Sequence, residues 1–357
     1  MVRPDKRGQG LADDLLFNMM RTLPKIELHR HLEGSVRLET LVSIASEYGI
    51  EMPEYTTETL RPFVQMMPNE TRNSQHFLAK FQTLRQFFRS PEIIHRVAYE
   101  VVADAAADNV KYLELRFTPP ALSSVMNCSY DEVVDWVCSA TAKAAAEHDI
   151  EVRLILSMNR HESTEIGENV LHTALNFRDR GVVALDLAGN ESGFSAAPFR
   201  TVFKKVKQAG FGITIHAGEW AGADNIRHAI EQLYADRIGH GVRALEDKNL
   251  CNLLVDRGIV LEVCPTSNVH SGVVNDWPLH PLARLYRQHM RTTINTDDPL
   301  VSNITLSDEL EQVMANLSFT LDDIKQQILT AARAAFLPEA ERSALVTKFE
   351  SWLAAVQ

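Results

Sequence analysis

The sequence predicts an α/β fold, a TIM (β/α)8 barrel with a helical insertion after strand 1 and C-terminal helices. Short β-branched runs alternate with longer amphipathic segments through most of the chain. Eight such runs occur, and most are separated by a helical pattern, as parallel βα units require. Unusual polar residues also stand where these runs end, and in a parallel barrel those ends meet at one face.

The expected strands and helices follow in order. The strands span residues 25–32, 110–118, 151–159, 182–189, 212–219, 237–242, 259–265 and 291–298. Amphipathic segments such as 131–148 and 199–210 lie between them, and the second ends in a glycine that suits a helix C-terminus. The connection 35–109, which includes the helical pattern 74–88, is too long for one helix. We therefore expect a helical insertion over the barrel mouth.

The tail from Leu306 onward is helical, and we expect it to pack on the outside of the barrel. No linker-like or low-complexity stretch divides the chain. Residues 1–357 are therefore expected to form a single domain, a length that an α/β barrel reaches as one unit.

The composition excludes several classes of binding partner and of covalent or metal cross-link. The formal net charge of −11 argues against nucleic acid, because proteins that bind it need a basic face. No apolar run approaches the ~18 residues of a membrane span, and the N-terminus lacks a signal-peptide pattern. The four cysteines show no CxxC spacing, so we expect neither disulfides nor a thiolate metal site. A reducing cytoplasm is the expected setting.

Polar side chains mark the ends of four expected strands. His29 and His31 end the first, His216 and Glu219 follow the fifth, His240 ends the sixth, and Asp297 with Asp298 ends the eighth. Alternation along a strand turns His29 and His31 to the same inward face. With His216 and Asp297 they make a three-nitrogen, one-oxygen set suited to zinc, and a position left open for water would make the site catalytic.

Most other histidines have no comparable context, and a structural role is the better interpretation for them. They are His76, His95, His148, His161, His172, His228 and His289.

Three further groups are candidates for acid–base chemistry. Burial beside apolar substrate would raise the pKa of Glu219 and let it donate a proton near neutrality. His240 lies between glycines in GHGV, where a neutral imidazole could take a proton from metal-bound water or stabilise the hydroxide. Asp298 could orient that water, accept a hydrogen bond from substrate, or support the metal ligands.

These motifs resemble the adenosine deaminase family of metal-dependent barrel aminohydrolases. The matching stretches, in the family's order, are LPKIELHRHLEGS, FLAKF, DLAGNE, TIHAGE, RIGHGV, CPTSNV and NTDDP. They cover the chain from about Leu23 to the eighth strand, and the ordered set is highly specific.

The resemblance implies one zinc ion per chain and a small-molecule purine nucleoside as substrate, with a monomer and a homo-oligomer both left open. The implied metal ligands are His29, His31, His216 and Asp297. Glu219 would protonate the purine nitrogen N1 while hydroxide, positioned by His240, attacks C6. Asp298 would bind water and N7, and Gly189 would offer its N–H to N3. The implied substrate contacts also include His31, Glu33, Phe77 and Phe81, the last two as part of a hydrophobic lid; helix core is an equally good interpretation of these two.

Glu33 departs from the commonest family pattern, in which Asp stands at this position in HxHLDG. Glu is found there in adenine deaminases and in enzymes that act on modified adenosines such as aminodeoxyfutalosine. The stretches DLAGNESGF and CPTSNVHSGVV resemble those of nucleoside deaminases more than those of free-base deaminases. Adenosine or 2′-deoxyadenosine is the preferred substrate, with adenine or a 5′-modified adenosine as the alternative.

Two other classes of function remain open. Amidohydrolase chemistry on esters or lactones uses the same barrel with two metals, often bridged by a carboxylated lysine on a middle strand. The stretches 151–159 and 182–189 contain no lysine. A barrel that only binds nucleoside is disfavoured because every expected ligand and acid–base position is filled.

Overall fold

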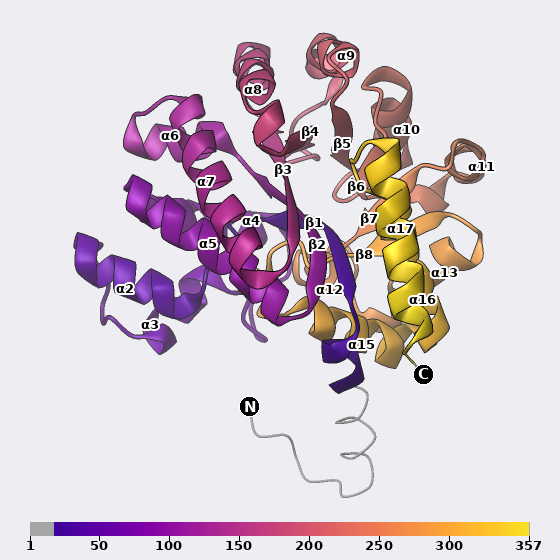
Figure 1. Cartoon of the computed structure of the whole chain (residues 1–357), viewed down its shortest axis with the longest axis horizontal. Coiled ribbons are helices and arrows are strands. Elements are labelled where there is room, and N and C mark those ends of the chain that lie inside the picture. The colour runs from indigo at the N-terminus through magenta and orange to yellow at the C-terminus, as the bar shows by residue number, and fades with distance from the viewer. Residues whose placement is uncertain (1–17, 357) are drawn as a thin grey trace, which may run out of the picture.

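Eight parallel strands form the centre of the molecule (Figure 1). The computed structural model describes residues 18–356, so the first seventeen residues and the last residue of the expected single domain lie outside it. The N-terminal stretch in which we expected no signal peptide lies largely among them. The strands pair in sequence order and are β1 (Lys25–His31), β2 (Val110–Phe117), β3 (Glu151–Asn159), β4 (Val182–Ala188), β5 (Gly212–Ala217), β6 (Arg237–His240), β7 (Val260–Val263) and β8 (Arg291–Ile294).

The barrel closes where the loop that follows β8 meets strand β1. Arg30 and Asp297 form a parallel bridge. The N–H of His31 donates to the carbonyl of Asp297 at 2.8 Å, and the N–H of Asp297 donates to the carbonyl of His29 at 3.0 Å. The predicted TIM barrel is confirmed, and its closing contact holds Asp297 beside both histidines of β1.

Several strands end earlier than the sequence predicted. β5 ends at Ala217 rather than 219, and β8 ends at Ile294 rather than 298. The backbone turns into the left-handed region at Gly218 (φ 66°) and Asp297 (φ 63°), away from the pleated strand conformation, and His240 (φ 61°) is the last residue of β6. Glu219, Asp297 and Asp298 therefore stand on loops beyond the strands.

The connection after β1 is helical, as predicted. It contains α2 (Leu38–Tyr48), α3 (Thr57–Val64), α4 (Ser74–Leu84), the 3-10 turn η1 (Arg85–Phe87) and α5 (Pro91–Ala107). The expected helix 74–88 thus ends in a tighter turn. α4 begins where the Asn73 side chain accepts the N–H of His76 at 2.8 Å, and it carries Phe77 and Phe81 to the barrel mouth.

The remaining helices surround the barrel (Figure 1). The expected helices 131–148 and 199–210 correspond to α7 and α9. The helices and 3-10 turns between β2 and α15 are α6 (Pro119–Met126), α7 (Tyr130–His148), α8 (Thr164–Asn176), η2 (Arg178–Arg180), η3 (Ala197–Phe199), α9 (Arg200–Gln208), α10 (Ala223–Gln232), η4 (Ala244–Glu246), α11 (Lys248–Arg257), α12 (Pro265–His270), η5 (Trp277–Leu279), α13 (Leu282–Arg287) and α14 (Pro299–Ser302).

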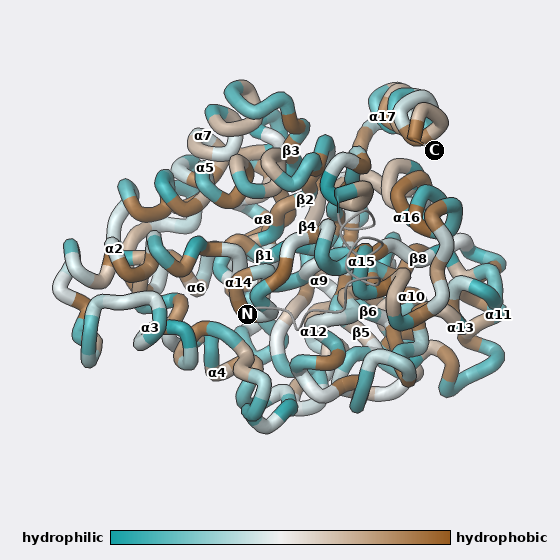
Figure 2. Tube along the Cα trace, turned by 90° about the horizontal axis from the view of Figure 1, so that it is seen from below, coloured by the Kyte–Doolittle hydropathy of each residue, from teal (hydrophilic) through white to brown (hydrophobic). Residues whose placement is uncertain are grey.

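The C-terminal tail packs on the outside of the barrel, as predicted. It forms α15 (Leu306–Leu317), α16 (Leu321–Ala334) and α17 (Glu339–Ala354). The Thr292 hydroxyl on β8 donates to the side-chain oxygen of Gln327 on α16 at 2.9 Å, and Ile328 is buried nearby. Figure 2 shows hydrophobic segments recurring along α5 and α16, interrupted by hydrophilic ones, as helices that cover a core require. Between residues 18 and 356, no helix has both the length and the apolar character needed to cross a membrane.

Candidate metal centre and active site

A cavity of about 290 Å³ opens at the carboxyl ends of the strands. Nearly all the predicted site residues line it, from segments as distant in sequence as β1 and the loop after β8. They are His31, Glu33, Phe77, Phe81, Gly189, His216, Glu219, His240, Asp297 and Asp298. The structure thus brings together the residues that the strand-end argument selected. His161, for which we expected a structural role, also lines this cavity.

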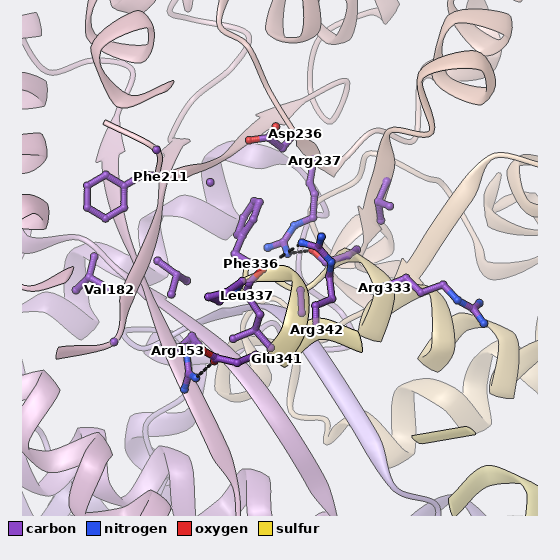
Figure 3. A pocket seen from close by; sticks show the side chains of 18 of the residues that line it. Arg153, Val182, Phe211, Asp236, Arg237, Arg333, Phe336, Leu337, Glu341 and Arg342 are labelled. Carbon is purple, nitrogen blue, oxygen red and sulfur yellow. Dashed lines mark hydrogen bonds and ion pairs between the residues drawn. The ribbon is translucent and has the colours of Figure 1, made fainter. Parts of the chain in front are cut away.

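A larger cavity, of about 960 Å³, lies at the opposite ends of the strands. The first residues of β4 to β8 line it together with the connection between α16 and α17. Figure 3 shows Arg237, Phe336 and Leu337 there, and the pair of Arg153 with Glu341. None of the predicted site residues lines it. The chemistry of the lining, rather than cavity size, therefore distinguishes the candidate site.

Four predicted ligands form a compact cluster. One donor atom from each of His29, His31, His216 and Asp297 lies within 4.8 Å of the others. Asp297 Oδ1 is 3.2 Å from His29 Nε2 and 3.4 Å from His31 Nε2, and the Nε2 atoms of His31 and His216 are 3.3 Å apart. His29 Nε2 is buried without a hydrogen-bond partner. Three imidazoles, one of them with an unpartnered ring nitrogen, and a carboxylate fit a divalent metal ion.

Buried carboxylates fix the orientation of two of these histidines. His29 Nδ1 lies 2.8 Å from Glu262 Oε2 on β7, and His216 Nδ1 lies 2.9 Å from Asp186 Oδ1 on β4. An ionised carboxylate can only accept, so each Nδ1 carries the proton and each Nε2 presents its lone pair to the cluster. The Arg116 guanidinium lies between both acids, 2.8 Å from Glu262 and 3.6 Å from Asp186.

Sequence reasoning missed Glu262, Asp186 and Arg116. Glu262 and Asp186 each stand within an otherwise apolar expected strand, which is an unusual place for a charged residue, whereas the strand of Arg116 also contains Lys111 and Glu114. That signal was available, but only the folded barrel shows which histidine each acid contacts.

A second group of possible ligands contains His29, His240, Cys264 and Asp297. Burial, followed by the nearby charge of Asp297, raises the pKa of the Cys264 thiol well above its usual value, which disfavours the thiolate that binds metals. Cys264 Sγ instead lies 3.6 Å from the carbonyl of Glu262. The set with three histidines and Asp297 is therefore the better metal centre.

A chain of hydrogen bonds sets the tautomer of His240. The Leu282 N–H, at the start of α13, can only donate, and it does so to His280 Nδ1 at 3.2 Å. Burial lowers the pKa of His280 to about 3, so the ring is neutral and its proton is on Nε2, 3.3 Å from Asn268 Oδ1. The Asn268 amide nitrogen then faces His240 Nδ1 at 3.0 Å. His240 Nδ1 accepts, so Nε2 carries the ring proton.

His240 Nε2 points toward the acidic groups of the cavity. It is 3.6 Å from Glu219 Oε2 and 4.0 Å from Asp297 Oδ2. A protonated Nε2 makes this ring a hydrogen-bond donor toward whatever lies between these groups. Sequence reasoning missed Asn268 and His280, because neither residue type in its local pattern indicates a catalytic contact.

Glu219 is buried, with 3% of its surface exposed. Burial raises the pKa of its carboxyl well above the usual value, and the charges of Asp297 and Glu191 raise it further. The carboxyl that faces the cavity therefore has a raised pKa, which favours its protonated form.

Asp298 and Glu33 are also buried carboxyl groups in the cavity wall. Burial raises the pKa of both, and for Asp298 the neighbouring Asp297 charge acts in the same direction. Asp298 Oδ1 and Glu33 Oε2 have no hydrogen-bond partner, whereas Glu33 Oε1 accepts the N–H of Thr118 at 2.9 Å. Both acid oxygens are therefore buried in the cavity wall without a protein hydrogen-bond partner.

Two glycines allow close approach in this region. Packing against Asp298 gives a steric reason for glycine at position 34. A β-carbon on Gly34 would lie 1.8 Å from Asp298 Oδ1, so only glycine leaves room for that carboxyl. Gly189 lines the cavity with a left-handed φ of 89°, a conformation that favours glycine.

A (β/α)8 barrel whose strand ends gather three histidines, an aspartate and a protonated acid is the architecture of metal-dependent barrel hydrolases. Comparisons with known proteins agree with this class. A family model described as adenosine deaminase matches residues 24–352. The adenosine deaminase of Clostridium perfringens (strain SM101 / Type A) is 37% identical over 317 residues, which cover 89% of this chain and 95% of that protein. The chain belongs to the adenosine deaminase family.

Solved structures share the fold. An adenine deaminase from Arthrobacter aurescens superposes with a TM-score of 0.86 at 26% identity, over 94% of this chain and all of that one. An amidohydrolase from Burkholderia ambifaria, with bound Zn, superposes with a TM-score of 0.85 at 26% identity, over 95% of this chain and 94% of that one. Family and geometry together indicate a divalent metal.

Proposed function

We propose that this protein hydrolyses the 6-amino group of adenosine and 2′-deoxyadenosine, releasing ammonia and forming inosine and 2′-deoxyinosine. One zinc ion per chain would be held by His29, His31, His216 and Asp297. The observation that carries the proposal is the combination of this cluster with the buried Glu219 carboxyl, whose pKa is raised by burial, in the wall of one cavity. The name of the Clostridium perfringens relative supports adenosine as the substrate.

Each residue has a role that its geometry supports. When bound, zinc supplies water of lowered pKa and stabilises negative charge on oxygen. Glu219 holds its proton in a buried site and donates it to the purine nitrogen N1, which makes C6 electrophilic. His240, with its proton on Nε2, orients the attacking oxygen by donating a hydrogen bond.

The rest of the wall positions the purine. Asp298 offers its carboxyl to N7, and the Gly189 N–H offers a hydrogen bond to N3. His31, one of the clustered histidines, would contact the purine. Phe77 and Phe81 on α4 would cover the entrance of the cavity with apolar surface. Apolar walls with a few placed polar groups are typical of small-molecule sites.

Glu33, which stands where the commonest family pattern has Asp, is the residue that bears most on the choice between a nucleoside and a free base. Its Oε2 is buried without a partner while its Oε1 is held by the Thr118 N–H. A sugar hydroxyl, which adenine lacks, would be one hydrogen-bond partner for this carboxyl. Adenine, named for the Arthrobacter aurescens structure, and 5′-modified adenosines such as aminodeoxyfutalosine form the alternative.

The setting we propose is the cytoplasm. All four cysteines, Cys128, Cys138, Cys251 and Cys264, are free thiols, as a reducing compartment favours.

Ammonia release tests the function directly. The purified protein is assayed with adenosine, 2′-deoxyadenosine, adenine, AMP and a 5′-modified adenosine, and zinc is measured in the same preparation. We expect the highest kcat/KM with the two nucleosides and one zinc per chain. Strong activity on adenine without activity on adenosine would overturn the substrate assignment. Two tightly bound metals per chain would contradict the mechanism.

A further inference from the structure

Glu191 binds the loop that carries the candidate proton donor. It follows β4 in the stretch DLAGNE, and its carboxylate accepts four consecutive backbone N–H groups and one side-chain amide. The donors are Gly218 (2.7 Å) and the Asn225 side chain (3.0 Å) to Oε1, and Glu219 (2.9 Å), Trp220 (2.9 Å) and Ala221 (3.1 Å) to Oε2.

This carboxylate is an internal anchor rather than a surface group. Glu191 has 3% of its surface exposed, and a buried carboxylate persists only when donors or cations compensate for lost water. Arg160 is a nearby positive charge that both Glu191 and Glu219 share. The five hydrogen bonds therefore satisfy Glu191 and at the same time order the loop.

The loop needs such an anchor because it has no regular structure. Residues 218–221 lie between the end of β5 and the start of α10. Their N–H groups belong to neither element, and no side chain caps α10 at Gly222. From the opposite direction, Arg243 Nε donates to the carbonyl of Glu219 at 2.9 Å. The N–H and the carbonyl of Glu219 are thus each held by a charged side chain.

We propose that Glu191 is a positioning residue for Glu219: it holds residues 218–221 so that the Glu219 carboxyl stays beside His240 and faces the substrate. The proposal rests on the role of Glu219 given under the proposed function. Glu191 does not itself line the cavity, so it acts through the loop. A shift of about 1 Å in a catalytic group can lower the rate about 10²-fold.

Glu191→Gln tests this role in the metal-loaded protein. Glutamine has nearly the same shape, but its NH2 group would face backbone N–H groups that can only donate. We expect kcat with adenosine to fall about 10²-fold, with KM changed less than about threefold and zinc content unchanged. Hydrogen exchange followed by mass spectrometry should show faster exchange at the amides of 218–221. Glu191→Asp, which keeps the charge, should recover part of the kcat.

Asp108→Asn is the matched control. Asp108 is also a buried carboxylate that accepts a backbone N–H, that of Ser307 at 3.0 Å, but it does not line the candidate site. The Asp108→Asn substitution should leave kcat and the hydrogen exchange of the amides of 218–221 unchanged. If Glu191→Gln does not fold, Asn225→Ala removes one of the five bonds and should raise exchange at 218–221 with a smaller loss of kcat.

Three outcomes would overturn the proposal. They are a Glu191→Gln variant with unaltered kcat, one whose loss of activity follows loss of zinc, and one in which residues 218–221 exchange as slowly as in the parent protein. Failure of the proposed function would appear differently, as full activity of Glu219→Gln or no deamination by the parent protein.

Discussion

His29 Nδ1 lies 2.8 Å from Glu262 Oε2, and both side chains are fully buried. The contact turns His29 Nε2 toward Asp297 and fixes the ring in the tautomer that a metal requires. Glu262 is in turn held by two arginines, with Arg116 Nη2 at 2.8 Å and Arg237 Nε at 2.6 Å. These cations hold the pKa of the Glu262 carboxyl well below its usual value, against the opposing effect of burial.

Glu262→Gln should therefore weaken zinc binding by about 10- to 100-fold, because the amide cannot stabilise the His29 ring with a charge. Competition with a chelator of known affinity measures this change, with Asp108→Asn as the control for altering a buried carboxylate. A folded variant that binds zinc as tightly as the parent protein would contradict the assigned role.

Glu219→Gln should lower kcat by about 10²- to 10⁴-fold, because it removes the proton that N1 receives. The amide has the same shape and the residue is not one of the metal ligands, so zinc content should stay at the parent level. Steady-state kinetics and metal analysis on the same sample check this. Near-normal turnover would show that another group donates the proton.

Asn268→Asp should reverse the tautomer of His240. A carboxylate at this position would accept a proton from His240 Nδ1, leaving Nε2 as an acceptor toward the cavity. We expect kcat to fall by about 10²- to 10⁴-fold, the upper figure being the known cost of a wrong histidine tautomer in a serine protease. Nitrogen-15 NMR of labelled histidine reports the tautomer directly, and an unchanged Nε2–H signal with normal kcat would refute the hydrogen-bond chain.

Gly34→Ala should disrupt the site sterically, since the added carbon would lie 1.8 Å from Asp298 Oδ1. We expect loss of activity together with a lower melting temperature. Gly49→Ala is the natural comparison, because Gly49 has φ 62° but nothing within 4 Å of the added carbon. It should cost about 1–2 kcal/mol of unfolding free energy from backbone strain and leave kcat intact. Equal kcat in the two variants would argue against the close approach.

Glu309 should make stability depend on pH. Burial raises the pKa of this carboxyl to about 8, although its hydrogen bonds from Thr266 oppose the shift. The folded state therefore holds a proton that the unfolded state releases near pH 4.5. The stabilisation from this proton is complete below that pH and is lost as the pH rises toward 8. Denaturant unfolding of the parent protein and of Glu309→Gln between pH 5 and 8.5 should show a stability difference that changes in favour of the variant as pH rises; a constant difference would contradict this.

The sequence was sufficient for the barrel and for bringing the strand-end histidines and acids to one cavity, but not for every residue that lines it, such as His161. Period-two alternation identifies His29 and His31 as neighbours on one face, and the convergence of parallel strand ends brings His216, His240 and Asp297 to them. These arguments need only local patterns and the geometry of the fold class.

The supporting residues could not be assigned in the same way. Glu191, Glu262 and Asn268 contact partners 27 or more residues away, and these hydrogen bonds form only once the strands that carry both partners have assembled. Strand ends were also placed too late, because left-handed residues such as Asp297 carry no local signal comparable to glycine. What the sequence did not reveal is therefore mainly which residues orient the groups that it had identified.

The bridge between Arg30 and Asp297 has a consequence for the order of folding. The same backbone contact that completes the barrel also brings the last ligand to the two histidines of β1. The ligand set spans residues 29 to 297, so a nascent chain cannot assemble it until the eighth strand and its following loop have left the ribosome. With the proposed ligand set, complete metal binding would then follow the meeting of the first and last strands.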